Sequence, residues 1–546
     1  MVDLEIPLGK RTRLYRFLEM LPAIISYGAI ITLVVLSLVN PLLAAIYLLL
    51  IILTMLVKVV GTTTHMVVGR LRMDQASRVD WRSRLEDLED PHAAYSRLYG
   101  STSTHIGHEQ HLENLRLMSA SEPGFFPKPS QIYNVVIMPA YNEPLEVIQP
   151  AVQAVLDTTY DKKHLIVIFA YEERGGAGIK KTAETLKKRY QSKFHSFHIV
   201  EHPKDLPNEV IGKGGNITHA GRWLKEYLEE QNIAFSDVIV TTMDCDNKPH
   251  KTYFDYLTYE YIAREDRKHL SYQPVCLFTN NIWDVPAPMR VVATGNSFWN
   301  IISSMRPHTL RNFASHAQPM DALVEMDFWS VRTIVEDGHQ YWRSYFYFGG
   351  NYEVVPLHVP IYQDAVLSGT YVKTLKAQFI QLRRWAYGAS DVPYVGVRVF
   401  SFQRNVPFWA GFTRFVRLLD GHITLACVSI LVAFGGWIPL LLNGEAARSM
   451  AVHELPDTIS ILQRVAMIGL VAMVFTSFKL LPPRPARYKR SRSVIMVLQW
   501  VLMPVTAIVY SSAAAFYSQT RLFFGKYLDK FDVTEKTLAT GKAKKH

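Results

Sequence analysis

Two apolar runs near the N-terminus constrain the fold of this chain more than any other feature of its sequence. Residues 21–39 and 42–60 are each long enough to cross a bilayer as a helix. Only Asn40 and Pro41 separate them, so we expect a tight transmembrane hairpin in residues 1–64. A signal peptide is the alternative interpretation of the first run. We reject it because no small-residue cleavage site follows and the second run begins at once.

Two more apolar runs occur in the last third of the chain. Residues 423–442 and 459–481 have the length and composition of spans, which makes four in all. We assign these C-terminal transmembrane helices to residues 421–493. The loop between them, residues 443–457, has no basic excess and is expected outside the cell.

The distribution of charge predicts the side of the membrane on which the rest of the chain lies. The net charge is +11, and the basic residues gather beside the spans. This positive-inside pattern predicts an integral plasma (inner) membrane protein with a cytoplasmic N-terminus and middle segment. Nucleic-acid binding is the other interpretation of a basic chain, and we expect none because the charge follows the spans. The flanking basic residues are Lys10, Arg11, Arg13 and Arg16 before the first span and Arg484, Arg487, Lys489, Arg490 and Arg492 after the fourth.

The long middle segment divides into a polar part and an α/β part. Residues 65–130 are polar and predict a juxtamembrane linker with some helix, whereas residues 131–365 alternate apolar runs with helical patterns. Strands that are apolar throughout predict a mostly parallel sheet covered on both faces. Ligands of such sheets bind at the carboxyl ends of the strands. The expected strands are 133–139, 164–171, 197–202 and 237–244, and the expected helices are 144–156, 179–190 and 213–231.

The stretch VIVTTMDCDN (238–247) places two carboxylates at the end of the fourth expected strand. Asp244 and Asp246 are one residue apart, which suits a hard divalent cation such as Mg²⁺ or Mn²⁺ bound through oxygen. Such a cation completes its coordination shell with substrate phosphates. The alternative is a solvated turn without a ligand, which is common for this short pattern.

Five further segments accompany the aspartates in a fixed order. Together with Met243-Asp-Cys-Asp246, they resemble the family 2 glycosyltransferases, and especially the membrane-embedded branch of cellulose, chitin and hyaluronan synthases. FDVTEK (531–536) also resembles the gating loop of bacterial cellulose synthase, so the resemblance covers nearly the whole chain. The five segments are PAYNEP (139–144), AYEERGG (170–176), GKGGNITHAGR (212–222), VEDGHQYW (335–342) and QLRRW (381–385).

The resemblance implies a catalytic domain of the GT-A fold inserted between transmembrane helices. The reaction that it implies is the inverting transfer of a sugar from a nucleotide sugar to a growing polysaccharide. We expect the nucleotide of this donor to be UDP. Asp337, beside Glu336, matches the family's general base, and a sugar hydroxyl needs such a base at neutral pH. The leaving diphosphate needs fixed positive charge, for which Lys213 and Arg384 are candidates. The alternative for the acidic pair is stabilisation of a helix N-terminus.

The QLRRW segment lies in a helical pattern whose apolar stripe predicts an interfacial helix within residues 366–420. Gln381, Arg384 and Trp385 share another face of that helix, suited to phosphate and a sugar ring. An interfacial helix anchored by tryptophan is the alternative. The nucleotide-sugar-binding residues implied by the resemblance are Tyr141, Glu143, Glu172, Lys213, Asp244, Gln381, Arg384 and Trp385. Glu172 departs from the family, which usually has an Asp-Asp pair there.

The C-terminal residues 494–546 contain one more apolar run and the gating-like tail. By length the run 494–517 would count as a fifth span, but a gating loop requires a cytoplasmic C-terminus, which four spans provide. We therefore predict an interfacial or re-entrant segment broken near Pro504. The tail residues that the resemblance assigns to gating are Phe531, Val533, Thr534 and Lys536.

Three functions remain open at this point. The first is a membrane-integrated synthase, processive or not, that extends a polysaccharide among membrane lipids. The second is a non-processive enzyme that glycosylates a lipid acceptor. The third is a non-enzymatic membrane protein with a degenerate transferase domain, which the intact Asp246, Asp337 and QLRRW motif disfavour.

Overall fold

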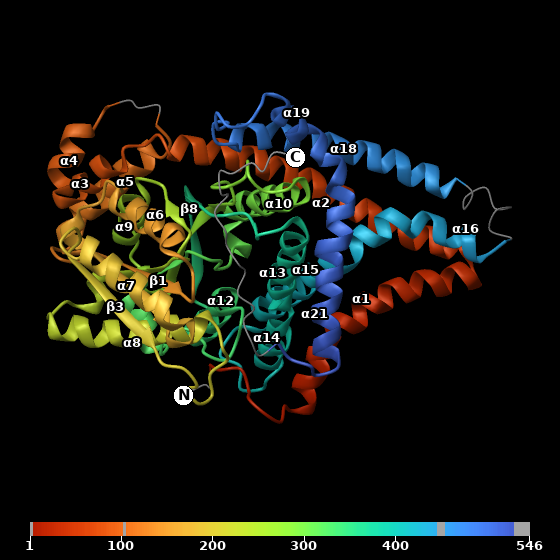
Figure 1. Cartoon of the computed structure of the whole chain (residues 1–546), viewed down its shortest axis with the longest axis horizontal. Coiled ribbons are helices and arrows are strands. Elements are labelled where there is room, and N and C mark those ends of the chain that lie inside the picture. The colour runs from red at the N-terminus through yellow and green to blue at the C-terminus, as the bar shows by residue number, and fades with distance from the viewer. Residues whose placement is uncertain (1–3, 102–104, 445–453, 529–546) are drawn as a thin grey trace.

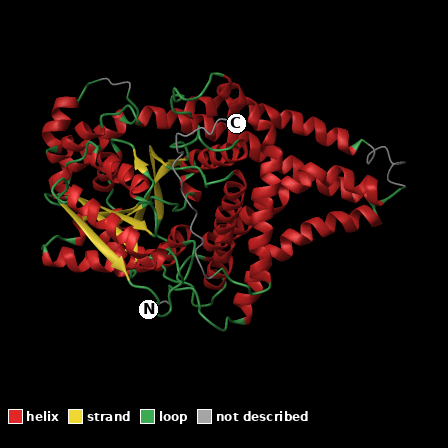
Figure 2. Ribbon diagram, viewed as in Figure 1, coloured by secondary structure: helices red, strands yellow, loops and turns green. Residues whose placement is uncertain are grey.

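The computed structural model describes residues 4–101, 105–444 and 454–528. It has two parts, an α/β domain on the left of Figure 1 and a group of long helices on the right. Figure 2 shows the strands confined to the α/β domain. The chain therefore contains the two kinds of structure that the sequence predicts, a mixed α/β domain and long apolar helices.

The N-terminal hairpin forms as expected. Helix α1 (Arg13–Val39) ends at Asn40, and α2 (Pro41–Ala76) begins at the next residue. The side chain of Asn40 accepts hydrogen bonds from the backbone N–H groups of Leu42 and Leu43, and proline suits the first helical position because it has no N–H to satisfy. The expected domain boundary at residue 64 falls inside α2.

Four helical segments of the described residues are long and apolar enough to cross a membrane. They are Arg13–Val39, Pro41–Ala76, Phe408–Leu442 and Ser491–Phe523. The third comprises α15 (Phe408–Phe434), a short turn and α16 (Ile438–Leu442). The expected span 459–481 lies in α18 (Leu455–Leu480), which runs beside α2 in Figure 1, but only Val471–Leu480 of it counts as an apolar helix among the described residues.

The segment Ser491–Phe523 is helical throughout and continues past Pro504, but the type of helix changes along it. It consists of α19 (Ser491–Leu498), a 3₁₀ turn, α20 (Met503–Thr506), a π-helical turn at Ala507–Ser512 and α21 (Ala513–Phe523). Figure 1 shows α19 along the top of the molecule and α21 running crosswise to α1 and α18. Its length and composition suit a span, and its bent course suits the interfacial segment that we predict.

Within the described residues, eight strands form one sheet in the order β3-β2-β1-β4-β7-β6-β8-β5. The four expected strands are parallel neighbours, which confirms the parallel half of the prediction. The other half was not foreseen and makes the sheet mixed, because β7 pairs antiparallel with both β4 and β6. The strands are β1 (Tyr133–Ala140), β2 (Leu165–Glu172), β3 (Ser196–His202), β4 (Val238–Thr242), β5 (Lys248–Pro249), β6 (Leu270–Leu277), β7 (Ala317–Pro319) and β8 (Glu353–Tyr362).

Helices cover both faces of the sheet. Val136 and Met138 of β1 face a core shared with α6 (Leu145–Leu156), α7 (Gly176–Tyr190) and α9 (Tyr253–Ile262). The alternating Val135 and Ile137 face a second core shared with α8 (Lys213–Glu230) and α11 (Met320–Glu325). Successive side chains of a strand alternate between these two buried cores, which explains why the strand sequences are apolar at nearly every position.

The polar linker docks on the α/β domain. It contains α3 (Trp81–Glu86), α4 (Pro91–Leu98) and α5 (His108–Ala120). Trp81 stacks on Tyr256 of α9 with ring centroids 3.7 Å apart, and Nδ1 of His111 lies 2.9 Å from the hydroxyl of Tyr259. These contacts fix α3 and α5 to α9.

Candidate active site

Three elements bring their first or last residues together at the carboxyl edge of the sheet. Lys213 begins α8, Asp244 follows β4, and Glu336 begins α12 (Glu336–Tyr347). The ammonium of Lys213 lies 2.9 Å from Oδ1 of Asp244 and 3.6 Å from Oε1 of Glu336. The structure therefore brings together residues from three of the motifs that the sequence singled out.

A glycine permits the close approach of α8 and α12. A β carbon on Gly214 would lie 2.3 Å from the carbonyl oxygen of Ser330 and 3.3 Å from Cβ of Glu336. Because the first of these atoms belongs to the backbone, it cannot rotate away. The absence of a side chain at Gly214 thus lets α8 pack closely against the segment before α12. This close packing brings the Lys213 ammonium next to the acidic start of α12.

The carboxylates keep Lys213 charged although its side chain is only 11% exposed. Burial lowers the pKa of Lys213, but the carboxylates of Asp244, Glu336 and Asp337 outweigh burial and leave the pKa raised. Lys213 is therefore a fixed positive charge in a site of low dielectric, where such a charge acts strongly on an anionic ligand.

The pKa values of the acidic pair at the start of α12 are raised as well, but here burial is the main cause. Burial raises the pKa of Glu336 to about 7, against the opposing effect of the Lys213 ammonium. Burial also raises the pKa of Asp337, while Lys213 and the backbone N–H of Gly338, 2.7 Å from Oδ1, lower it. Two neighbouring carboxyls that resist simultaneous ionisation are typical of acid–base sites.

The QLRRW motif lies on α13 (Tyr371–Ala386), and Arg384 reaches this site electrostatically. The Arg384 guanidinium lowers the pKa of Asp337 in opposition to burial. Gln381 accepts a hydrogen bond from the side chain of Gln378 at 3.0 Å. The indole of Trp385 is 38% exposed, with its ring centroid 5.9 Å from that of Phe278. Arg384 thus lies near enough to act on the charge of Asp337, and Gln381 and Trp385 lie on the same helix.

The surroundings of the two aspartates after β4 limit the kind of cation that they could bind. Asp246 is buried and Asp244 is partly exposed beside Lys213. Among the residues that the structure describes, no group of three or more His, Cys, Asp or Glu could hold a metal ion. Two carboxylates on one turn fit Mg²⁺ or Mn²⁺ that takes its other ligands from water and phosphate, rather than a metal enclosed by protein.

The loops after β1 and β2 form the neighbouring part of the edge. The carboxylate of Glu143 accepts a hydrogen bond of 2.7 Å from the backbone N–H of Tyr141, which shapes the turn after β1. A β carbon on Gly175 would lie 1.7 Å from the carbonyl oxygen of Tyr141, so the two loops touch. Strands β2, β1 and β4 are parallel neighbours, so their carboxyl ends lie at the same edge of the sheet. This edge therefore carries Tyr141, Glu143 and Glu172 as well as Asp244.

Glu172 ends β2 and already has two protein partners. Its Oε1 lies 3.0 Å from Nδ1 of His202, and its Oε2 lies 3.4 Å from the guanidinium of Arg174. Sequence reasoning missed His202 and Arg174. Arg174 stands inside the AYEERGG motif and could have been noticed, whereas His202 becomes visible only when β3 is paired with β2.

The expected gating residues Phe531, Val533, Thr534 and Lys536 lie outside the described residues. The described chain ends at Leu528, whose backbone N–H donates to the hydroxyl of Tyr387 at 3.1 Å. Tyr527 and Leu528 pack against a cluster that includes Ile334 and Val335, the two residues before Glu336. The tail therefore departs from a point beside the start of α12.

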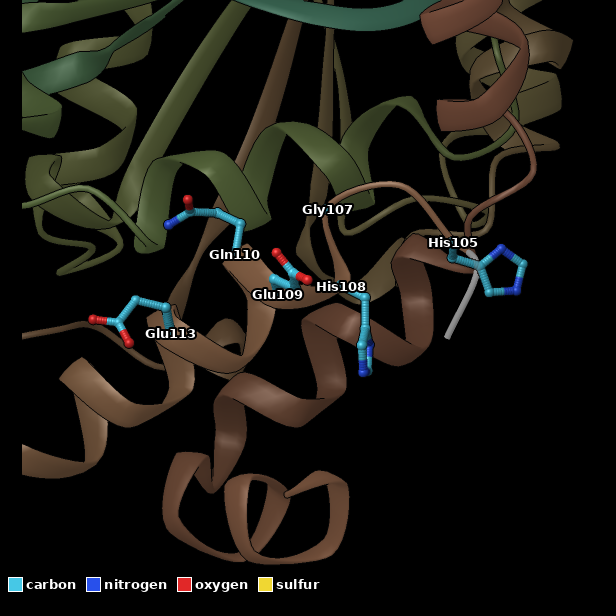
Figure 3. A pocket seen from close by; sticks show the side chains of 6 residues that line it. All are labelled: His105, Gly107, His108, Glu109, Gln110 and Glu113. Carbon is cyan, nitrogen blue, oxygen red and sulfur yellow. The ribbon is translucent and has the colours of Figure 1, made fainter. Parts of the chain in front are cut away.

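A surface pocket of about 510 Å³ lies elsewhere, on α5. It is lined by His105, Gly107, His108, Glu109, Gln110 and Glu113. Figure 3 shows the imidazoles and carboxylates pointing in different directions, which does not suit a metal centre. This pocket shares no residue with the site around Lys213.

Comparisons with known proteins give distant likenesses. No protein-family model and no curated protein matches the sequence. A mannosyltransferase from Pyrobaculum calidifontis, solved with GDP-Man and Mn²⁺, aligns with 82% of this chain and 100% of its own at 14% identity, with a TM-score of 0.40. S. aureus TarS with UDP-GlcNAc aligns with 73% of this chain and 93% of its own at 12% identity, with a TM-score of 0.36. TM-scores below 0.5 are too low to decide fold or activity.

The contact at Gly214 gives a first prediction. Gly214→Ala should destabilise the fold by ~1–3 kcal/mol, the usual cost of overpacking, because the new methyl group meets the backbone of Ser330. Thermal unfolding of purified protein measures the effect. Gly178→Ala in α7 is the control, since no described atom lies within 4 Å of its added β carbon. Equal unfolding temperatures for the two variants would contradict the close approach of α8 and α12.

Proposed function

We propose that the chain is an inverting, metal-dependent glycosyltransferase of the family 2 type with a GT-A catalytic domain. It moves a sugar from a nucleotide sugar, UDP-linked in our reading, to a growing polysaccharide at the cytoplasmic face of the membrane. The observation that carries this proposal is the meeting of the Lys213 ammonium with Asp244 and with the Glu336–Asp337 pair. Cationic and acidic groups within one small site suit a diphosphate leaving group and a hydroxyl nucleophile.

The donor diphosphate binds beside Lys213 and Arg384. Lys213 is held charged by its neighbours, and its position is fixed by the start of α8. These cations are in place before the bond breaks, so they stabilise the developing negative charge without reorganisation. When bound at Asp244 and Asp246, Mg²⁺ or Mn²⁺ supplies further positive charge at the diphosphate.

Asp337 takes the proton from the acceptor hydroxyl. The backbone N–H of Gly338 holds Oδ1 of Asp337, which fixes the orientation of the carboxylate. Burial raises the pKa of Asp337, and a raised pKa makes a carboxylate a better base near neutral pH. Glu336, whose pKa burial raises to about 7, binds a proton readily and so limits the repulsion between the two groups.

The packing of α13 supports a location of the site at the membrane. The hydroxyl of Ser518 in α21 donates to the backbone carbonyl of Arg383 at 2.7 Å, directly before Arg384. The apolar segment Ser491–Phe523 therefore touches the helix that carries the cationic motif. An acceptor that remains at the membrane would lie close to the site, and we place both termini in the cytoplasm.

The general base gives a second prediction. Asp337→Asn keeps the shape of the side chain but cannot take a proton, so sugar transfer should fall by roughly 10²–10⁴-fold. Nucleotide binding should survive. In the wild type the rate should fall as the pH decreases through the raised pKa of Asp337, because transfer needs the carboxylate. Initial rates from pH 5 to about 9 measure both effects, with exposed Asp157→Asn as the control. Near wild-type transfer by Asp337→Asn would assign the base to another residue.

The metal gives a third prediction and the main test of the activity. Purified protein should release nucleotide from one member of a nucleotide-sugar panel when Mg²⁺ or Mn²⁺ is present, and excess EDTA should stop the release. Asp246→Asn should lower turnover by at least ~100-fold, the scale of losing one preorganised charge-stabilising group. Product size by gel or mass spectrometry separates polysaccharide from a singly glycosylated lipid. Full turnover in EDTA would reject metal dependence.

The tail gives a fourth prediction. If residues 531–536 close over bound nucleotide, truncation after Leu528 should abolish transfer without releasing the protein from the membrane. Truncation after Leu538 is the matched control, because it removes Lys542, Lys544 and Lys545 but keeps FDVTEK. Transfer assays on both proteins separate the motif from the basic charge of the tail. Transfer that persists after Leu528 truncation would rule out gating.

A further inference from the structure

His202 joins two loops at the carboxyl edge of the sheet. It is the last residue of β3, in register with Glu172 at the end of β2, and its side chain is buried. Its Nδ1 lies 3.0 Å from Oε1 of Glu172, and its Nε2 lies 3.1 Å from Oε2 of Glu209. One imidazole ring therefore bridges two carboxylates from different segments.

This geometry requires a charged imidazole. A neutral histidine has one N–H, but ionised carboxylates only accept hydrogen bonds, so both ring nitrogens of His202 must donate. Burial lowers the pKa of His202, and the hydrogen bonds and charges of Glu172 and Glu209 outweigh burial and raise it to about 9. The titratable and charged groups around the ring come from three places. They are Glu172, Glu173 and Arg174 at the end of β2, Lys204, Asp205 and Glu209 in the loop after β3, and His219 and Arg222 on α8.

The bridge links the two ends of the proposed donor site. Glu172 stands where the sequence resemblance expects contact with the nucleobase. Glu209 precedes Lys213 by four residues, and the backbone N–H of Val210 donates to the carbonyl of Val331 at 2.8 Å. Asp205 and Asn208 have left-handed backbone angles, with φ of 61° and 65°, so this loop follows a course that needs tertiary contacts to hold it.

We propose that His202 is a positioning residue of the nucleotide site, whose imidazolium holds the Glu172 carboxylate at the nucleobase end and the 203–212 loop that presents Lys213 at the diphosphate end. The inference rests on the proposed function. Without the imidazolium, Glu172 and Glu209 are like charges that repel each other. The Glu209 end of the loop then loses its tie to β3, while Lys204 and Asp205 keep their ion pairs with the loop after β2. Donor binding then depends on a residue that touches no donor atom.

His198 provides a matched control. It lies on the same strand and, by the alternation of strands, on the same face as His202. Its ring packs against Trp223 at 4.7 Å and Tyr227 at 4.5 Å, and burial lowers its pKa to about 4, so it is neutral. His198→Gln therefore removes a packed histidine without removing a charge.

The first experiment measures binding of UDP and GDP to the purified full chain with Mg²⁺, by calorimetry. His202→Gln should weaken binding of the nucleotide that the wild type prefers by at least ~10-fold, the loss expected for a hydrogen bond to a charged group. His198→Gln should lower the unfolding temperature and leave the dissociation constant unchanged. A dissociation constant for His202→Gln within twofold of the wild type would overturn the positioning role.

The second experiment works without any ligand, so it separates this inference from the proposed function. The pKa of His202 is raised from its usual value near 6.5. Its stabilisation is therefore complete below about pH 6.5 and is lost as the pH rises through about 9. The difference in unfolding temperature between wild type and His202→Gln should shrink over that range, and the difference for His198→Gln should stay flat. A constant difference for His202→Gln would overturn the charged bridge.

If the wild type binds neither UDP nor GDP, the proposed donor is wrong and the positioning role is wrong with it. The pH series still decides whether the charged bridge exists.

Discussion

The buried ammonium of Lys213 is the interaction on which the rest of the site depends. An isolated lysine in this position would lose its proton, because a buried charge is costly without partners. Asp244, in the turn after β4, and Glu336, at the start of α12, supply those partners. Removing one partner of a buried ion pair is far more damaging than never having built it. The start of α8, the end of β4 and the start of α12 are thus fixed relative to one another by charge.

Charge could not bring these elements together if their backbones were kept apart. Gly214 lets α8 approach the backbone of Ser330, and Gly175 lets the loop after β2 approach Tyr141. Both positions lie at the carboxyl edge, where parallel strands end side by side. The glycines of the two motifs therefore serve packing first. A ligand that enters this edge meets polar groups whose positions were set by close backbone contact.

The sequence predicted the parts of the fold that local patterns determine. The hairpin at Asn40, the first four strands and the helices between them follow from apolar runs and caps. The second half of the sheet was missed because β6 is buried throughout yet contains Ser271, Gln273 and Pro274, which hide an apolar strand pattern. In the site, Lys213 and the carboxylates could be predicted from motifs. The His202 bridge could not, since it depends on the pairing of β3 with β2, which no local pattern records.

The helix that carries Arg384 is held by Ser491–Phe523, a segment long and apolar enough to cross a membrane. The guanidinium of Arg383 lies against the ring of Tyr517, and Ser518 of α21 bonds the backbone at Arg383. A π-helical turn directly precedes α21 in the chain. The side-chain amide of Gln519 in α21 also donates a hydrogen bond to the backbone carbonyl of His422 in α15. A π-turn changes the direction of a helix at a defined place, often where function requires it. The position of the backbone at Arg384 is therefore set by contacts with α21, so this cation, unlike Lys213 on α8, depends on helices outside the α/β domain.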